Sequence, residues 1–483
     1  MLTLQHVLIA FIGKSIGNLD FKISEGCIDS RHVPPFSMFF ALKGENTDGH
    51  LYVDEAFAKG ANLAIIEHPI HSEFPIVDIR EGTGALPSQP PFSLLVENTL
   101  QALQKLAAYW RRQFNLKVIG ITGSVGKTST KELTASVLSQ RYVTLKNPGN
   151  LNNEIGLPLT LLQLNENHQV AVLEMGFYVP GDIAQLCNIA LPQIGIVTNI
   201  GTVHAERAGS IEAIAAGKSE LVQVLPPAPE GVAILNYDDE RVLAMAHQTR
   251  ASVFTYGLDP QADLWADEIE SMGLEGIRCR MHYRGEDFYL TAPLIGRHSV
   301  YTLLRSAAAA LCLGFNWAAI FDAFKNSQLQ LRITTVQTAS GALLLDDTYN
   351  ASPDSTLAAL NLLADLDGRK VAVLGDMLEL GQYEEDGHQR IGIRAAEVAD
   401  ELVFVGQRTK TSLNAALEAG FPANKAHWFA TPSEATQYLR NILKDGDIAL
   451  IKGSNAMRMD QIVSSLEVVP HERFHFGNCY QRF

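Results

Sequence analysis

The chain has 483 residues and a formal net charge of −15, with 47% hydrophobic and 19% charged residues. At about 100–200 residues per domain, this length predicts about three domains. The acidic balance and the lack of any Lys/Arg-rich run argue against a nucleic-acid binder, which would carry a basic patch.

Membrane and secreted classes are also disfavoured. The sequence has no stretch of about 18 apolar residues, so no membrane span is expected, and the short apolar run at 7–12 lacks the flanks of a signal peptide. The five cysteines are widely spaced and never form a C-x-x-C pair, so they predict neither a disulfide framework nor a zinc site. We therefore expect a cytoplasmic protein, and we expect it to be a monomer.

The pattern of apolar runs predicts two series of strands separated by helices. A stretch rich in Pro, Gly and Ser at 80–92 predicts a linker or loop, and a helix is expected at 99–114. The first series of strands is expected at 116–121, 170–173, 194–198 and, after a proline-rich loop, 232–235. The second series is expected at 343–345, 371–374, 402–405 and 448–451.

Alternating strands and helices predict parallel sheets with crossover helices, which is an α/β fold class. We expect three domains: an N-terminal domain at 1–96, a central nucleotide-binding domain with a parallel sheet at 97–330, and a C-terminal Rossmann-like domain at 331–483.

The strongest motif is GITGSVGKT at 120–128, between a predicted strand and a predicted helix. Backbone N–H groups of such a loop point at phosphate oxygens, and the helix N-terminus adds positive potential. Lys127 is expected to reach the β- and γ-phosphates, and the Thr128 hydroxyl to bind Mg²⁺. The strict pattern G-x-x-x-x-G-K-[ST] asks for glycine where this chain has Ile121. The loop alone does not separate a ligase from a kinase, a GTPase or a motor.

Several polar residues near this loop allow two interpretations each. Glu174 ends a predicted strand, where a carboxylate can hold Mg²⁺ or cap a helix. His204 is by itself more typical of a structural histidine, and Lys218 is on composition a surface lysine of a helix. A polar loop fits either a substrate contact or a simple turn, and it contains Asn150, Asn152 and Asn153.

Taken together, several runs resemble the Mur ligase family, in order and over nearly the whole chain. They are DSRHVPPFSMFFALKGENTDGHLYVDEAFAKGA (29–61), GITGSVGKTSTKEL (120–133), GNLNNEIGLPLTLL (149–162), LEMG (173–176), TNIGTVHAERAGSIEAIAAGKSEL (198–221), LNYDDE (235–240), LLLDDTYNASPDSTLAAL (343–360), VLGDMLELG (373–381) and IKGSNAMRM (451–459).

The resemblance implies a P-loop central domain and an ATP-dependent ligase that phosphorylates a substrate carboxylate. An amine then attacks the acyl phosphate, and ADP and phosphate leave. ATP and two Mg²⁺ ions are the implied cofactors. The implied catalytic residues are Lys127, Lys218, His204 and Glu174, with Lys218 carbamylated. The implied metal ligands are Thr128, Glu174, His204 and Lys218. The implied nucleotide contacts are Gly123, Ser124, Val125, Gly126, Lys127, Thr128, Ser129, His298 and Arg332.

The stretch DDTYNASPDS is similar to that of the family member that adds D-alanyl-D-alanine, and the DNPR sequence of the diaminopimelate-adding member is absent. The implied substrates are therefore UDP-N-acetylmuramoyl-tripeptide and D-alanyl-D-alanine. The implied contacts of the UDP-sugar are Ser30, Arg31, Asp48 and Gly49. The other implied substrate contacts are Asn150 and Asn153 and, near the dipeptide, Asp347, Tyr349, Asn350 and Ala351.

One segment departs from the family pattern. Many relatives have G-x-H-N-x-x-N where the adenine is held, and this chain has GRHSVYT at 296–302. Both asparagines are thus replaced, by Ser299 and Thr302, whose hydroxyls reach less far than an amide.

Two other functions remain open. One is a different amide ligase of the same superfamily, adding another residue to the muramoyl peptide or glutamate to folate. The other is a regulatory P-loop NTPase. Polar clusters at predicted strand ends argue against the NTPase, because ligands of open α/β sheets gather there. These clusters are Asp346–Asp347, Gly375–Asp376 and Lys452–Ser454.

Overall fold

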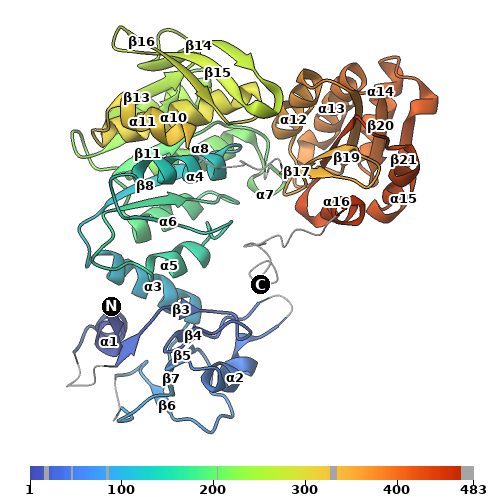
Figure 1. Cartoon of the computed structure of the whole chain (residues 1–483). Helices are drawn as coiled ribbons and strands as arrows, with labels where there is room; N and C mark the ends of the chain where they lie inside the picture. The colour runs from blue at the N-terminus through green and yellow to red at the C-terminus, as the bar shows by residue number, and fades with distance from the viewer. Residues whose placement is uncertain (16–20, 45–46, 83–85, 204, 327–333, 469–483) are drawn as a thin grey trace.

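Three large β-sheets form the framework of the molecule (Figure 1). The computed structural model describes residues 1–483 apart from 16–20, 45–46, 83–85, 204, 327–333 and 469–483. Each sheet lies within one of the three predicted domain ranges, and the α/β class is confirmed; the boundaries at 96/97 and 330/331 stay a prediction. No helix in the described ranges has the length and apolarity to cross a membrane.

The N-terminal sheet is parallel, with five strands in the order β3-β4-β5-β7-β6. Its strands are β3 (Gly26–Cys27), β4 (Met38–Phe40), β5 (Leu63–Ile66), β6 (Ile76–Asp78) and β7 (Phe92–Leu95). Its other elements are β1 (Leu2–Thr3), α1 (Leu4–Ile12), β2 (Lys22–Ile23), η1 (Gly49–Tyr52) and α2 (Val53–Ala58). The segment predicted as a linker or loop at 80–92 joins β6 to β7, so it is a loop within this sheet and not a linker between domains.

The central sheet has nine strands in the order β16-β15-β14-β13-β12-β11-β8-β10-β9. The four predicted strands appear as β8 (Lys117–Thr122), β10 (Val170–Glu174), β11 (Ile194–Val197) and β12 (Val232–Asn236). They pair in parallel with each other and with β9 (Thr144–Lys146) and β13 (Ser252–Gly257). An unpredicted antiparallel extension consists of β14 (Leu264–Ser271), β15 (Ile277–Tyr283) and β16 (Glu286–Ala292).

Helices cover both faces of the central sheet. One face carries α4 (Lys127–Leu138), α10 (Val300–Cys312) and α11 (Trp317–Lys325). The other carries α3 (Thr99–Arg111), α5 (Gly156–Leu161), α6 (Asp182–Ala190) and α8 (Ile211–Gln223), and two short helices lie nearby, α7 (Ala205–Ala208) and α9 (Glu240–Leu243). The predicted helix α3 also packs against α1, β4 and β5, so one continuous apolar core joins the N-terminal sheet to the central one.

The C-terminal sheet has six strands in the order β17-β18-β22-β19-β20-β21, parallel except for β17. The four predicted strands are β18 (Leu343–Asp347), β19 (Arg369–Gly375), β20 (Glu401–Val405) and β22 (Asp447–Lys452), with β17 (Thr334–Gln337) and β21 (Ala426–Phe429) at the edges. One face carries α12 (Pro353–Asp365), α13 (Glu384–Val398) and α14 (Thr409–Glu418), and the other carries α15 (Pro432–Ile442) and α16 (Asp460–Leu466).

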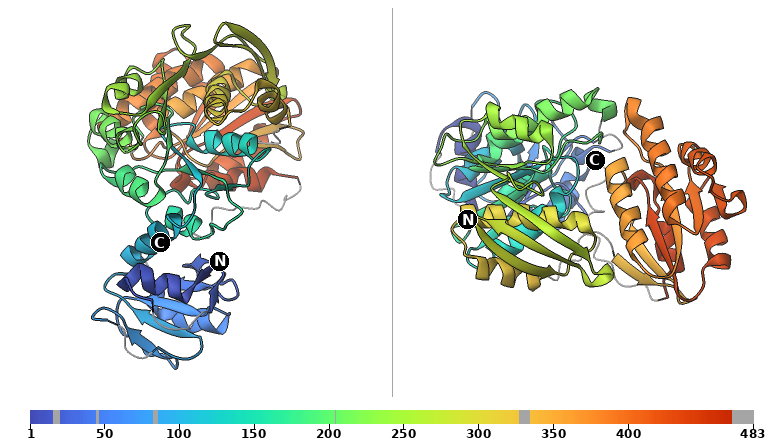
Figure 2. Two further views of the ribbon diagram at one scale, coloured as in Figure 1. Left: turned by 90° about the vertical axis from the view of Figure 1, so that its left-hand side faces the viewer. Right: turned by 90° about the horizontal axis from the view of Figure 1, so that it is seen from above.

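The C-terminal unit lies beside the central unit, and the N-terminal unit stands apart from the C-terminal unit (Figure 2). The backbone N–H of Glu206, in α7, donates to the carbonyl of Glu379 at 3.2 Å. Gln382 Nε2 donates to the carbonyl of Gly209 at 3.4 Å. Both contacts join the loop after β19 to the segment that follows β11. The carboxyl ends of the parallel strands of the central and C-terminal sheets therefore face each other.

Candidate active site

The loop between β8 and α4 has the strand–loop–helix form predicted for a phosphate loop. Gly123 (φ 138°) and Gly126 (φ 85°) both lie in the left-handed region, which favours glycine. A Cβ on Gly123 would lie 1.9 Å from Thr198 Oγ1 at the end of β11. The loop therefore requires glycine there because its backbone runs directly against the neighbouring strand end.

Hydrogen bonds fix this loop to the segment after β11. Ser124 N donates to the Asn199 carbonyl at 2.9 Å, and Val125 N donates to Asn199 Oδ1 at 2.8 Å. Lys127 Nζ lies over the loop and donates to the carbonyls of Gly123 at 2.8 Å and Ser124 at 3.3 Å. The predicted lysine is thus held at the entrance of α4, where a phosphate would meet the first N–H groups of the helix.

Glu174 ends β10, directly beside the start of the phosphate loop, as predicted. Asn147 holds its backbone, accepting from Glu174 N at 2.9 Å and donating to its carbonyl at 3.0 Å. Asn152 Nδ2 donates to Glu174 Oε1 at 2.8 Å. Glu174 Oε2 is buried and has no hydrogen-bond partner among the described residues. A buried carboxylate oxygen without a partner is costly, which fits a cation ligand.

The asparagines of the polar loop at 150–153 make different contacts. Asn153 Oδ1 accepts from the backbone N–H of Gly156 at 2.9 Å and so starts α5. The carbonyl of Asn150 accepts from Asn152 N at 2.7 Å, which closes a turn. Asn152 contacts Glu174 and so belongs to the candidate metal site, although the family resemblance implies only Asn150 and Asn153 as substrate contacts.

Lys218 lies in α8 and is only 1% exposed, so the composition-based prediction of a surface lysine is wrong. Its Nζ lies 4.5 Å from the centre of the Phe177 ring, and no carboxylate of a described residue forms an ion pair with it. Burial, together with the positive charge of Lys127, holds the pKa of the Lys218 amine well below its usual range. This shift favours the neutral, nucleophilic form of the amine.

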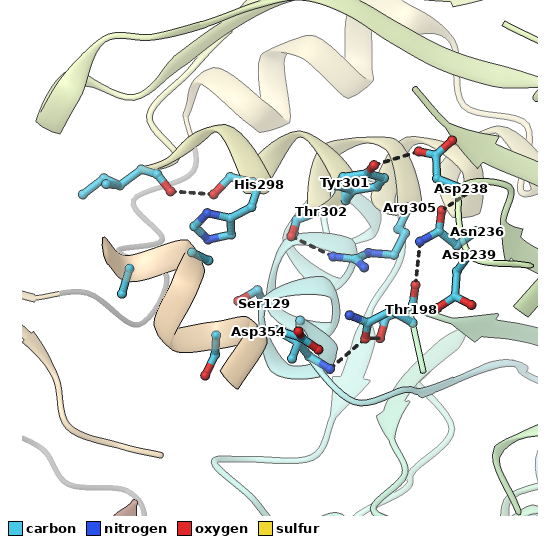
Figure 3. Close-up of a pocket in the computed structure, with 18 of the residues that line it drawn as sticks. Ser129, Thr198, Asn236, Asp238, Asp239, His298, Tyr301, Thr302, Arg305 and Asp354 are labelled. Carbon is cyan, nitrogen blue, oxygen red and sulfur yellow. Dashed lines mark hydrogen bonds between the residues drawn. The ribbon is translucent and has the colours of Figure 1, made fainter. Parts of the chain in front are cut away.

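A cavity of about 630 Å³ opens between the central and C-terminal units (Figure 3). The phosphate loop contributes Val125, Gly126 and Ser129, and the C-terminal unit contributes Asp347, Asp354 and Lys452. Both units thus supply polar groups to one space. Of the predicted polar strand ends, Asp347 and Lys452 line it, whereas Gly375 and Asp376 are not among its lining residues.

Another part of the cavity wall consists of residues at and after the end of β12 and residues in the first turns of α10. These residues include Asn236, Asp238, Asp239, His298, Tyr301, Thr302 and Arg305. Burial lowers the pKa of His298, although the negative charge of Asp347 opposes the shift, and this favours the neutral ring. Ser299 Oγ donates to the carbonyl of Ile295 at 2.6 Å. The Ser299 hydroxyl that replaces the family amide is therefore used within the chain.

Asp354, at the start of α12, reaches across to the central unit. A Cβ on Gly201 would lie 2.7 Å from Asp354 Oδ2. Burial and the negative charge of Asp239 raise the pKa of Asp354, against the effect of Arg390. The C-terminal unit thus touches residues 199–201, the segment whose Asn199 accepts hydrogen bonds from the phosphate loop.

Of the predicted dipeptide residues, Asp347 ends β18 and lines the same cavity, and Tyr349, Asn350 and Ala351 follow in the next loop. Lys452 Nζ donates to Asp347 Oδ2 at 2.6 Å and to the carbonyl of Asn350 at 2.8 Å. Tyr349 is 42% exposed, whereas Ala351 is buried in the C-terminal core. The buried ion pair fixes the loop that carries these residues, and their contact with a dipeptide stays a prediction.

The predicted UDP-sugar residues lie at the carboxyl edge of the N-terminal sheet, away from the cavity. Ser30 follows β3, and its hydroxyl donates to Glu55 of α2 at 3.2 Å. Gly49 N donates to the Leu42 carbonyl at 2.8 Å. Asp48 Oδ1 accepts from His50 N at 3.0 Å and lies 2.6 Å from His50 Nδ1. Arg31 is paired with Asp29 at 2.7 Å.

Two predicted site residues, His204 and Arg332, lie outside the described residues. The structure adds cavity residues to which sequence analysis gave no role, among them Asn199, Asp238, Asp239, Asp354 and Arg305. Asp238 and Asp239 stand in the family-like run at 235–240. The signal for Arg305 is an arginine inside the apolar helical run at 300–312.

Three family models match consecutive parts of the chain: the Mur ligase family catalytic domain at 22–111, the Mur ligase middle domain at 121–310 and the Mur ligase glutamate ligase domain at 331–455. A UDP-N-acetylmuramoyl-tripeptide–D-alanyl-D-alanine ligase of Synechocystis sp. is 37% identical over 457 residues, which cover 94% of each chain. The chain belongs to the Mur ligase family.

Solved Mur ligases share the whole architecture. MurF from Acinetobacter baumannii superposes with a TM-score of 0.82 and 33% identity, covering 96% of this chain and 98% of that one. MurF ligase from Thermotoga maritima, in complex with ADP, gives a TM-score of 0.77 and 27% identity, covering 92% and 96%. A Mycobacterium tuberculosis folylpolyglutamate synthase, at 17% identity and a TM-score of 0.61 over 76% of this chain and 94% of that one, shares the fold alone.

Lys127→Ala should lower the rate of ATP-dependent turnover by about 10²–10³, because the phosphate loop loses its side-chain cation. ADP release under saturating substrates measures this. Lys117→Ala, which removes an exposed lysine at the other end of β8, is the matched control and should leave the rate unchanged. Activity of Lys127→Ala within about twofold of wild type would contradict the phosphate-loop assignment.

Proposed function

We propose that this Mur ligase joins D-alanyl-D-alanine to UDP-N-acetylmuramoyl-tripeptide, with ATP converted to ADP and phosphate. The observation that carries the proposal is the cavity in which the phosphate loop faces the strand ends of the C-terminal unit. Three relatives at 32–37% identity are UDP-N-acetylmuramoyl-tripeptide–D-alanyl-D-alanine ligases, and their names supply the substrates. The ADP complex of the Thermotoga maritima MurF ligase supports the nucleotide.

The chemistry requires an activated carboxylate, because a carboxylate is a poor electrophile. An oxygen of the terminal tripeptide carboxylate attacks the γ-phosphorus of ATP, and ADP leaves. The dipeptide amine then attacks the acyl carbon, phosphate leaves, and the nitrogen loses a proton. Catalysis of this kind depends on positioning and on neutralising charge. Lys127 and the first N–H groups of α4 provide that neutralisation at the phosphates.

The three units then divide the substrates between them. The UDP-sugar is expected at Ser30, Arg31, Asp48 and Gly49 of the N-terminal sheet, and the nucleotide at residues 123–129 and His298. The dipeptide is expected beside Asp347, Tyr349, Asn350 and Ala351, across the cavity from the phosphate loop. Because one chain supplies both walls of the cavity, we propose a monomer, and because ATP is the energy source, a cytoplasmic location.

We further propose that Mg²⁺ binds beside the phosphate loop. Thr128 lies in the first turn of α4, and the unpartnered Glu174 Oε2 offers a buried anionic oxygen, so the described residues fit a hard cation. When bound, Mg²⁺ offsets the negative charge that gathers on the phosphate oxygens. Asn152 keeps the carboxylate of Glu174 oriented through Oε1 and leaves Oε2 for the cation.

We propose that Lys218 acts as a carbamate. In its neutral form the amine attacks the carbon of CO₂, forms an N–C bond and releases one proton, which converts the neutral side chain into an anionic oxygen ligand. The low pKa imposed by burial favours the reacting form of the amine. An anion there would also pair with the positive charge of the nearby Lys127.

With UDP-N-acetylmuramoyl-tripeptide and ATP, D-alanyl-D-alanine should support phosphate release far better than D-alanine, L-lysine, diaminopimelate or L-glutamate. The physical reason is that the C-terminal loop presents a fixed set of polar groups to one amine substrate. A coupled phosphate assay and mass spectrometry of the product measure this preference. Turnover with a single amino acid or with folate and glutamate, and none with the dipeptide, would contradict the proposed specificity.

Lys218→Ala should be nearly inactive, and added acetate or propionate should restore part of the rate by replacing the missing anion. Lys218→Arg should stay inactive, because it keeps a positive charge. The same acids on wild-type protein are the control for general salt effects. If neither acid rescues Lys218→Ala over a wide concentration range while Lys218→Arg retains substantial activity, the carbamate proposal is wrong.

A further inference from the structure

Arg305 is a buried cation in the wall of the nucleotide cavity. It projects from α10 toward α4 (Figure 3) and is only 5% exposed. The helix around it, VYTLLRSAAAALC, is otherwise apolar or small. An arginine in such a helix costs free energy unless something compensates its charge.

The described part of the chain does not supply that compensation. Arg305 Nη2 donates to Thr302 Oγ1 at 3.0 Å, and its guanidinium lies 5.9 Å from the centre of the Tyr256 ring. Burial raises the pKa of the Tyr256 hydroxyl to about 12 and outweighs the charge and hydrogen bonding of Arg305, which lower that pKa, so both neighbours are neutral. Arg305 forms no ion pair with a carboxylate of any described residue, and its Nε is buried without a hydrogen-bond partner. Structural arginines of comparable burial satisfy their guanidinium differently: Arg111 donates to three backbone carbonyls.

The guanidinium lies against the phosphate loop. A Cβ on Gly126 would lie 2.8 Å from Arg305 Nη2 and 3.5 Å from Nη1. Gly126 is the residue immediately before α4, and Ser129 of the first turn lines the same cavity. The unpaired cation is therefore placed where backbone N–H groups already favour an anion.

Arg305 also lies close in sequence to the segment 296–302, which departs from the family pattern G-x-H-N-x-x-N. Ser299 uses its hydroxyl on Ile295, and Thr302 uses its hydroxyl to accept from Arg305. Neither side chain therefore offers the amide contact of the family pattern. Thr302 instead orients a guanidinium one helical turn further along, toward the phosphate loop.

We propose that Arg305 binds the phosphate chain of the nucleotide and is a specificity-determining residue of this chain. A guanidinium presents paired N–H donors that suit phosphate oxygens. In relatives with the family pattern, asparagine amides contribute to nucleotide affinity at the adenine. In this chain, contacts between Arg305 and the phosphates would make that contribution. This inference rests on the proposed use of ATP and deepens it.

The test is calorimetric binding of ADP and adenosine to the full chain, comparing wild type with R305M, R305K and R278M. R305M should weaken ADP binding by about 10- to 100-fold, as expected for a lost charge-assisted hydrogen bond. Adenosine affinity should change by less than about twofold. R305K, which keeps the charge but loses the planar fork, should lose less ADP affinity than R305M. R278M removes an exposed arginine of β15 and controls for net charge.

Thermal unfolding separates this role from a structural one. Methionine fills similar volume without an unpaired charge, so R305M should unfold at the same temperature as wild type or higher. A lower melting temperature with unchanged ADP affinity, or equal losses for ADP and adenosine, would overturn the proposal. If wild type binds ADP and neither R305M nor R305K loses affinity, only the role of Arg305 is wrong. If wild type binds no ADP, the proposed function is wrong as well.

Discussion

The close packing of the phosphate loop against the end of β11 sets the geometry of the whole site. Gly123 passes so near Thr198 that no side chain fits between them, and Asn199 accepts two N–H donors of the loop. The same segment continues to Gly201, against which Asp354 of the C-terminal unit lies. One short stretch of chain therefore positions both the nucleotide loop and the wall opposite it, and a shift at residues 198–201 would disturb both.

Buried polar groups that the described residues leave incompletely compensated mark where ligands complete this fold. Glu174 Oε2, the Lys218 amine and the Arg305 guanidinium are all buried around the phosphate loop. Each carries a cost that a structural role does not explain, because native proteins pair nearly all such groups. Bound cation, carbamate and phosphate chain would satisfy the three in turn. Ligands that supply these partners would remove the cost, which favours their tight binding.

Strands with continuous apolar runs were predictable, and so was the phosphate loop, because burial on both faces leaves a local signature. The extension β14 to β16 was missed because its residues alternate between buried and exposed and carry many charges. The burial of Lys218 and Arg305 was not predictable from composition, since it depends on which helix face meets the sheet. The loop at 80–92 has linker composition, but β7 after it returns to the first sheet, a pairing that only tertiary structure determines.

Catalysis in the proposed function depends on activation of a carboxylate by transfer of phosphate to it in the cavity. The most direct measurement uses UDP-N-acetylmuramoyl-tripeptide labelled with ¹⁸O in its terminal carboxylate, with ATP and D-alanyl-D-alanine, followed by mass spectrometry of the released phosphate. Because one carboxylate oxygen bridges to phosphorus and leaves with it, each phosphate should carry one labelled oxygen. Amide product accompanied by unlabelled phosphate would contradict carboxylate activation and the account of the site built on it.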